Sequence, residues 1–279
     1  MNQPRAQIYQ QAYEAVLNSP YWYSDGPQLL DEKFNADNTG RRADVLIDIL
    51  RRAANRKAER QLSKQYLSLA DKLAACRFDR CGSSACLKCL RAFQQAKAVA
   101  HCKVIHKLAA MHPNRLWHIV TIIPLELNYP SSTLHEFDAG AFNRHLIDTL
   151  TRGGLIRPFL GSIDFSLERF HARKCWQPHW HLPLQTNDPE LLRAYLKEIF
   201  PPINKHDYPV DITEAKTLDF VPYVHKGVKI NHLLRTGRTH LPELLLALDL
   251  INPLDLIVMH GLVLSAQGYG FNFELADGF

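Results

Sequence analysis

The sequence has no apolar run of the length that crosses a membrane, and its N-terminus has no apolar core of the kind that marks a secretory signal. Its most apolar stretch, residues 244–264, is interrupted by Asp249, Pro253, Asp255 and His260. We therefore expect a cytoplasmic protein with no membrane partner. Thiols are reduced in that compartment, so clustered cysteines indicate a metal site rather than disulfides.

Internal repeats and low-complexity segments are also absent. Hydrophobic residues make up 46% of the chain and charged residues 22%, which excludes wholesale disorder, collagen and coiled coil. The 279 residues suffice for one large domain or two small ones. A net charge of +5 permits a polyanionic partner without requiring one, and 14 histidines direct attention to metal or acid–base chemistry.

A helical period dominates the first part of the chain. We expect an irregular arm over residues 1–42, an amphipathic helix within residues 43–75 and a second helix over 90–111. The amphipathic helix carries a series of basic side chains, Arg51, Arg52, Arg56, Lys57 and Arg60. These side chains form either a solvated helix face or a surface that helps to hold a polyanion.

From residue 116 the pattern changes to short strands that alternate with helices. Strands are expected over residues 116–123, 155–167, 179–185 and 208–213, and helices over 138–151, 189–200 and 217–228. The last 40 residues predict a helix and an irregular tail. This order indicates an α+β fold, in which an antiparallel sheet has flanking helices. The expected divisions are an N-terminal arm and helix (1–75), a cysteine-rich segment with a helix (76–112), the sheet domain (113–230) and a C-terminal helical tail (231–279).

Four of the six cysteines lie within 14 residues, at Cys76, Cys81, Cys86 and Cys89. Four thiols this close can supply a tetrahedral zinc site, which would stabilise a segment too polar to fold by core burial. His101 or Cys102 on the following helix can replace Cys76 as fourth ligand, and ordinary free cysteines are the other interpretation. A thiol-rich cluster without a neighbouring carboxylate base predicts structural rather than catalytic zinc.

Two histidines two residues apart, His179 and His181, fall on a predicted strand, where their side chains point to the same face. The preceding strand places Asp164 and Glu168 on one face, and a carboxylate from it can complete a two-histidine, one-carboxylate site for a divalent cation. We choose Asp164, because it lies nearer the middle of its strand. The alternative is that the two histidines are ordinary packed or exposed side chains.

The segment after the last predicted strand contains Asp219, Tyr223 and Lys226, whose spacing places them on one face of a helix. A phenol is a poor nucleophile. A nearby lysine and a metal-polarised phosphate would let it attack a phosphodiester, and an adjacent carboxylate could activate water. Tyr223 can also be a core aromatic with a satisfied hydroxyl, and Tyr195 is the alternative nucleophile.

Taken in order, these motifs resemble the plasmid rolling-circle replication initiators of the HUH endonuclease superfamily, over roughly residues 76–228. Residues 81–89 (CGSSACLKC) look like the thiol-rich segment of that family, with Leu87 where a proline is usual. Residues 177–182 (QPHWHL) are similar to its His-hydrophobe-His motif. Asp164 stands where the family commonly has a glutamate, and residues 219–226 resemble the segment that carries its nucleophilic tyrosine.

The resemblance implies an HUH or RRM-like sheet and a metal-dependent DNA endonuclease and strand transferase. His179, His181 and Asp164 would hold Mg²⁺ or Mn²⁺, and the cysteines would hold structural zinc. Tyr223 would nick single-stranded or hairpin origin DNA and form a 5′-phosphotyrosyl link, with Lys226 offsetting charge and Asp219 assisting release. Host replication proteins are further expected partners. A non-catalytic, zinc-containing DNA-binding protein and a metal-dependent hydrolase unrelated to DNA are the rival hypotheses.

Overall fold

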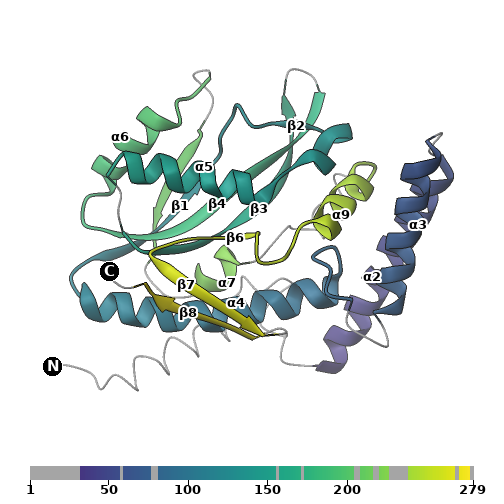
Figure 1. Cartoon of the computed structure of the whole chain (residues 1–279), viewed down its shortest axis with the longest axis horizontal. Helices are drawn as coiled ribbons and strands as arrows, with labels where there is room; N and C mark the ends of the chain where they lie inside the picture. Colours follow the sequence, from purple (N-terminus) through teal and green to yellow (C-terminus); the bar gives the residue numbers. More distant parts are fainter. Residues whose placement is uncertain are drawn as a thin grey trace.

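An antiparallel sheet forms the centre of the structure, with helices on both of its faces (Figure 1). The predicted α+β class and the antiparallel sheet with flanking helices are therefore confirmed. None of the described helices combines the length and the apolar character that spanning a membrane requires. In this computed structural model of the protein, the described residues are 32–56, 59–76, 81–154, 157–170, 173–203, 208–215, 220–225, 238–267 and 270–276.

The sheet has the strand order β5-β1-β4-β3-β6, and all of its described pairings are antiparallel. A two-residue strand, β2, pairs with the beginning of β4. Four of these strands lie where the sequence predicts strands, and β4 begins earlier than predicted because its first residues pair with the end of β3. The strands are β1 (Leu116–Ile122), β2 (Tyr129–Pro130), β3 (Phe159–Phe170), β4 (Arg173–Thr186), β5 (Val210–Glu214) and β6 (Ile257–His260).

Helices cover the two faces of the sheet in different ways. One face packs on α5 (Ala139–Arg152) and α6 (Pro189–Ile199), and the other faces α4 (Leu87–Met111) and α7 (Phe220–Val224). On the first face, Trp180 of β4 stacks on Phe142 of α5 with ring centroids 3.8 Å apart. The carboxylate of Asp188 caps α6 by accepting a hydrogen bond from the Leu191 amide, at 2.8 Å.

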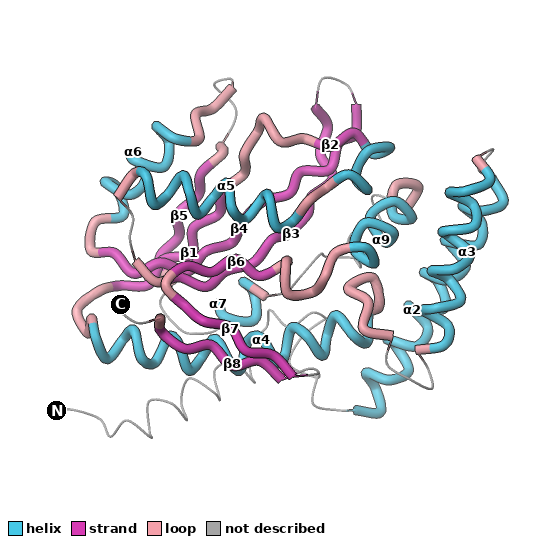
Figure 2. Tube along the Cα trace, in the orientation of Figure 1, coloured by secondary structure: helices cyan, strands magenta, loops and turns pink. Residues whose placement is uncertain are grey.

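At one end of the sheet, two N-terminal helices pack side by side against α9 (Figure 2). They are α2 (Glu32–Arg56) and α3 (Arg60–Ala75), while α9 spans Leu241–Leu250. An ion pair between Lys72 and Asp249, at 2.7 Å, joins α3 to α9. The predicted irregular arm is wrong for residues 32–42, which belong to α2, and residues 1–31 lie outside the described part of the chain.

The basic series of the amphipathic helix is partly neutralised by acidic neighbours. Arg51 forms an ion pair with Asp71 of α3 at 3.2 Å, and Arg52 forms one with Asp48 at 2.8 Å. All four of these side chains are exposed to solvent. These contacts favour the interpretation of this helix face as a solvated, ion-paired surface.

The C-terminal part of the chain contains strands that the sequence prediction missed. After α9, β6 pairs with the beginning of β3, from Phe159 opposite His260 to Ser162 opposite Ile257. Next, β7 (Leu262–Gln267) and β8 (Gly270–Leu275) form a separate hairpin that lies along α4 (Figure 1). The predicted irregular tail is therefore wrong. Because β6 has only four residues, it shows no clear period in the sequence, and its conformation depends on pairing with β3.

One hydrophobic cluster joins all of the segments into which the sequence was divided. It includes Leu50 of α2, Leu90 of α4, Trp180 of β4 and Phe273 of β8, all of which are buried. The 3₁₀ helix η2 (Ser131–Glu136) contributes to the same cluster and packs on α9. The four segments expected from the sequence thus share one hydrophobic core.

A single buried amide connects three elements of this core. The Nδ2 atom of Asn143, on α5, donates hydrogen bonds to the carbonyl oxygens of Asp255 and Ile257, at 2.8 and 3.0 Å. Its Oδ1 atom accepts a hydrogen bond from Nε1 of Trp180 at 3.2 Å. Asn143 therefore holds α5 against both β6 and β4.

We expect Asn143→Leu to lower the free energy of unfolding by about 2–4 kcal/mol, because it leaves the Trp180 N–H and two carbonyl groups buried without their partner. The measurement is chemical denaturation followed by circular dichroism. Arg144→Leu, at the exposed neighbouring position, is the control and should change the free energy by less than about 0.5 kcal/mol. Equal stability of the Asn143→Leu variant and the wild-type protein would contradict this role.

Candidate functional site

The central strand β4 places two histidines on the sheet face opposite to Trp180. Its continuous pairing with β1 and β3 preserves the two-residue alternation, so His179 and His181 share a face. On β3, Asp164 lies opposite His179. On β1, Thr121 lies opposite His181. The sheet register therefore gathers polar side chains from three neighbouring strands.

The structure brings together the three metal ligands that the sequence predicts. Oδ2 of Asp164 lies 3.5 Å from Nε2 of His181 and 3.8 Å from Nε2 of His179. One ligand atom from each of the three side chains can be chosen such that all lie within 4.8 Å of one another. Glu168, the rejected carboxylate, is exposed farther along β3 and does not belong to this group. Together the three side chains form a two-histidine, one-carboxylate group that fits a divalent cation.

Each histidine of this group is oriented by a contact at its other ring nitrogen. Nδ1 of His179 donates to the carbonyl oxygen of Gln177 at 3.1 Å, and Nδ1 of His181 lies 2.9 Å from Oγ1 of Thr121. A histidine that donates from Nδ1 presents the lone pair of Nε2, which is the form that ligates a metal. Both Nε2 atoms face the Asp164 carboxylate, and the Gln177 contact prepares His179 as a ligand for a cation.

The metal group lies in the interior and not on an open face of the sheet. Asp164, His179 and His181 are only 5, 8 and 3% exposed. The reason is that α7 packs over β4 on this face, and α4 packs over α7. Burial strengthens electrostatic interactions within the group, and it narrows the access of any substrate.

Glycine is required where β3 approaches the metal group. A Cβ atom at Gly161 would overlap with the backbone carbonyl oxygen of His181 and with the Leu182 side chain. Because glycine lacks that atom, β3 can lie close to β4 beside His181.

The predicted nucleophile lies beside the metal group. The ring of Tyr223, on α7, has its centroid 5.0 Å from that of His181, and the side chain is half-buried. Pro222 occupies the third position of α7, where a backbone N–H would have no partner within the helix, so it does not prevent helix formation. Asp219 and Lys226, the other predicted catalytic residues, lie outside the described part of the chain.

Helix α7 is fastened to the sheet and to α4. The hydroxyl of Ser162, on β3, donates a hydrogen bond to the Val224 carbonyl oxygen. On the other side, apolar side chains of α7 pack against apolar side chains of α4. These contacts fix the backbone of α7 both before and after Tyr223. The apolar residues are Phe220, Val221 and Val224 of α7, and Ala98, Cys102 and Ile105 of α4.

A buried histidine pair forms a further connection that the sequence analysis missed. Nδ1 of His101, on α4, lies 2.9 Å from Nε2 of His225, which directly follows α7. Burial lowers the pKa of His101 to about 3. Burial, followed by the nearby His101 and Lys97, lowers the pKa of His225 well below its ordinary value. The pair is therefore neutral at neutral pH, and no local motif predicts a contact between residues so far apart in the sequence.

Tyr195, the alternative nucleophile, lies on the opposite face of the sheet. It belongs to α6, and its hydroxyl donates a hydrogen bond to the carbonyl oxygen of Leu150 on α5, at 3.3 Å. The hydroxyl also packs against Gly153, where a Cβ atom would overlap with it. Tyr195 is thus a packing residue between α5 and α6.

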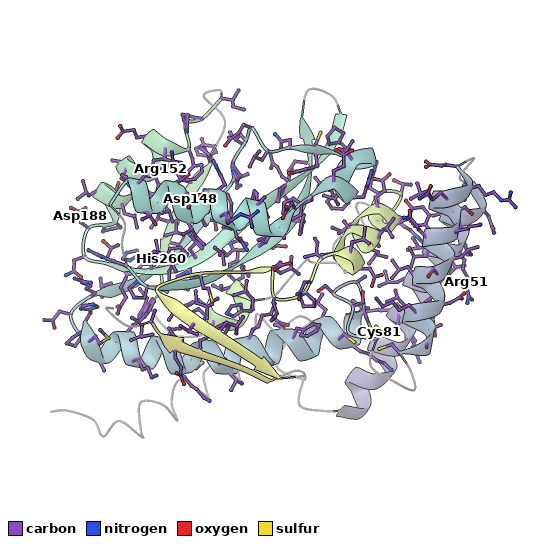
Figure 3. All side chains as sticks on the ribbon, in the orientation of Figure 1. Arg51, Cys81, Asp148, Arg152, Asp188 and His260 are labelled. Carbon is purple, nitrogen blue, oxygen red and sulfur yellow. The ribbon has the colours of Figure 1, made fainter. Side chains whose placement is uncertain are left out.

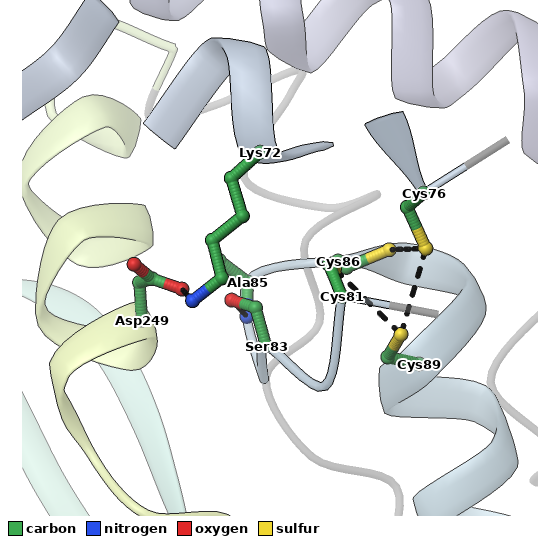
Figure 4. Close-up of polar contacts among 8 residues, drawn as sticks. All are labelled: Lys72, Cys76, Cys81, Ser83, Ala85, Cys86, Cys89 and Asp249. Atoms are coloured by element: carbon green, nitrogen blue, oxygen red, sulfur yellow. Dashed lines mark hydrogen bonds and ion pairs between the residues drawn. The ribbon is translucent and has the colours of Figure 1, made fainter. Parts of the chain in front are cut away.

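The four clustered cysteines converge at the junction of α3 and α4 (Figure 4). Sulfur–sulfur distances are 3.4 Å for Cys76–Cys86, 3.6 Å for Cys76–Cys89 and 3.7 Å for Cys81–Cys89. Zinc–sulfur bonds of about 2.3 Å in a tetrahedron require sulfur atoms about 3.8 Å apart. The arrangement therefore fits a four-cysteine zinc site with Cys76 as the fourth ligand.

The local backbone explains how these thiols meet. Cys76 ends α3, Cys86 precedes the first residue of α4, and Cys89 lies in the first turn of α4. Gly82 has a φ of 68°, a left-handed conformation that turns the chain between Cys81 and α4. His101, weighed as a substitute ligand, instead contacts His225.

The thiols of the cysteine cluster lose their protons only when a bound cation compensates the resulting negative charge. Hydrogen bonds that the Cys86 thiol donates to Cys81 and Cys89, followed by burial, hold the pKa of Cys86 far above its ordinary value. A bound zinc ion would displace the thiol protons, and the N-terminus of α4 would further favour the resulting thiolates. Since the cluster joins two helices, binding would contribute directly to the stability of this region.

We expect the purified protein to contain about one zinc ion, and Cys86→Ser to lose it and to lower the thermal unfolding midpoint, because a structural metal stabilises only the folded chain. Elemental analysis and thermal denaturation measure both effects. Cys175→Ser, which changes a buried cysteine of β4 outside the cluster, should retain zinc. Absence of zinc from wild-type protein prepared without chelators would contradict the assignment.

We expect His179→Ala to weaken Mn²⁺ binding about tenfold or more, because it removes one of three converging ligands. Titration followed by the electron paramagnetic resonance of free Mn²⁺ provides the measurement. His145→Ala, an exposed change on α5, should leave the affinity unaltered, and unchanged zinc content would show that the variant is folded. Equal Mn²⁺ affinity in His179→Ala and wild type would exclude this group as the Mn²⁺ site.

Comparisons of the chain with protein-family models, with curated proteins and with solved structures find no match. A functional assignment must therefore come from the chemistry of the residues themselves. The geometry offers two such sites, a four-cysteine cluster with the features of a structural zinc site and a buried Asp164–His179–His181 group beside Tyr223.

Proposed function

We propose that the protein is a metal-dependent endonuclease and strand transferase that initiates rolling-circle replication by nicking single-stranded or hairpin origin DNA. The observation that carries the proposal is the position of Tyr223, whose ring lies 5.0 Å from that of the predicted ligand His181. A nucleophile beside a divalent-cation site is the arrangement that phosphodiester cleavage through a covalent intermediate requires.

The chain's own residues account for the binding and orientation steps. When bound, Mg²⁺ or Mn²⁺ would polarise a phosphate oxygen and orient the phosphodiester. His179, His181 and Asp164 would hold the cation, with His179 kept in the ligating form by Gln177 and the His181 ring positioned by its contact with Thr121. Because α7 is attached to β3 and α4, the Tyr223 side chain would have few alternative positions relative to the phosphate.

The covalent step exchanges one ester for another. The phenolic oxygen of Tyr223 forms a bond to phosphorus, the bond from phosphorus to the 3′ oxygen breaks, and the phenolic proton is balanced by the proton that the released 3′ oxygen gains. The products are a 5′-phosphotyrosyl link and a free 3′ hydroxyl that can prime synthesis. Lys226 and Asp219 keep the roles that the family resemblance implies, charge compensation and assistance of hydrolytic release.

The burial of the metal group favours one alternative function, that of a DNA-binding protein without catalytic activity. Because Asp164, His179 and His181 are almost completely buried, a DNA phosphate reaches them only if α7 shifts. A non-catalytic, zinc-containing DNA-binding protein that keeps the fold needs no such access. The two hypotheses differ in whether Tyr223 becomes attached to DNA.

We expect wild-type protein with Mn²⁺ to become covalently attached to a pool of randomised single-stranded oligonucleotides, and Tyr223→Phe to abolish the attachment, because only the phenolic oxygen is removed. The label belongs at the 3′ end, since the downstream fragment retains the phosphate. Denaturing gels then show the labelled protein.

Tyr195→Phe is the matched control, because it removes the same atom on the other face of the sheet. It should attach normally. Attachment that persists in Tyr223→Phe would transfer the role to another residue. A wild-type protein that binds the randomised oligonucleotides in the presence of Mn²⁺ without becoming attached to them would establish the non-catalytic alternative.

A further inference from the structure

A second site lies at the end of the sheet where β4 leads into α6. A pocket of about 510 Å³ opens there, between the beginnings of β1 and β3 and the C-terminal end of α5. Arg115, Arg157 and Gln185 line it together with Tyr195. Asp188, which also borders the pocket, is labelled in Figure 3 at the beginning of α6. None of the residues of the metal group or of the cysteine cluster lines this pocket.

Two arginine side chains line the pocket together with a single carboxylate, that of Asp188. Nη1 of Arg157 donates to the carbonyl oxygen of Gln185 at 2.7 Å, and no ion pair involves Arg115 or Arg157 among the described residues. Burial, followed by the charge of Arg115, lowers the pKa of Arg157. The Asp188 carboxylate, which accepts a hydrogen bond from the Leu191 amide, is the one acidic group that the structure describes in the lining. Two guanidinium groups against one carboxylate leave the lining with an excess of one positive charge.

The carbonyl oxygen of Gln185 holds the Arg157 side chain at the pocket. The Gln185 side chain follows that of His181 by four residues on β4, so it is turned to the metal-group face of the sheet, whereas Tyr195 and α6 lie on the opposite face. Arg115 and Arg157 are therefore the cationic donors of the pocket.

We propose that this pocket binds a phosphate group. Guanidinium groups match the geometry of phosphate oxygens and donate to them in pairs. The pocket volume lies in the range of small-molecule sites, so it accommodates a phosphate together with an attached nucleoside. The phosphate comes either from the backbone of a bound DNA strand or from a free nucleotide. The inference is independent of catalysis at Tyr223.

Calorimetric titrations with inorganic phosphate and with thymidine monophosphate test the site directly. We expect saturable binding of both to the wild-type, full-length protein. Arg115→Gln and Arg157→Gln should each weaken binding about tenfold, because each removes a charge-assisted contact.

Arg152→Gln is the matched control, because it removes the same charge from α5 beside the pocket (Figure 3). Its affinity should remain within about twofold of the wild-type value. Equal losses in Arg152→Gln and the pocket variants would overturn the proposal in favour of a diffuse electrostatic effect, and so would wild-type protein that binds neither ligand. Zinc content and the thermal unfolding midpoint verify that each variant is folded.

A ten-nucleotide single strand distinguishes the two sources of the phosphate. If the pocket variants weaken binding of the oligonucleotide and of thymidine monophosphate alike, and the two compete, the pocket holds a backbone phosphate of DNA. If the variants weaken only the mononucleotide, the ligand is a free nucleotide. Both results support a phosphate site, and both are independent of whether Tyr223 becomes attached to DNA.

Discussion

Strand β4 pairs with β1 on one side and with β3 on the other. Because it is central, both of its faces are covered, one by the hydrophobic core and the other by the metal group. Trp180 and Leu182 enter the hydrophobic core, while His179 and His181 point away from it. A shift of one residue in register would exchange the two sets, burying imidazoles against α5 and leaving a tryptophan among polar groups. The requirement to bury Trp180 therefore also fixes the direction of the histidines.

Helix α7 depends on this arrangement and completes it. Five residues are too few to form a stable helix alone, so tertiary contacts must hold α7 in place. The Ser162 hydroxyl anchors it to β3, and the pair of His101 and His225 anchors its end to α4. Because burial keeps this pair neutral at neutral pH, the contact adds no charge to the interior. The same packing that positions Tyr223 also covers the metal group.

The cysteine cluster serves a different purpose, because it lies where α3 and α4 meet. Cys76 ends α3 and Cys89 belongs to α4, so a zinc ion there would hold the N-terminal helix pair to the layer beneath the sheet. The Lys72–Asp249 ion pair connects the same helix pair to α9. Together with the shared hydrophobic cluster, these contacts make the N-terminal helices part of the main structure.

The sequence by itself determined the local features: the cysteine spacing, the shared direction of His179 and His181, and the cap at Asp188, because each depends on residues a few positions apart. Only the tertiary structure decided the rest. The pairing of Asp164 with His179, the placement of Tyr223 and the contact of His101 with His225 all arise from sheet register and helix packing. Strand β6 likewise exists through its partner β3. Such contacts join residues distant in the chain, and their free energy appears only after the core has formed.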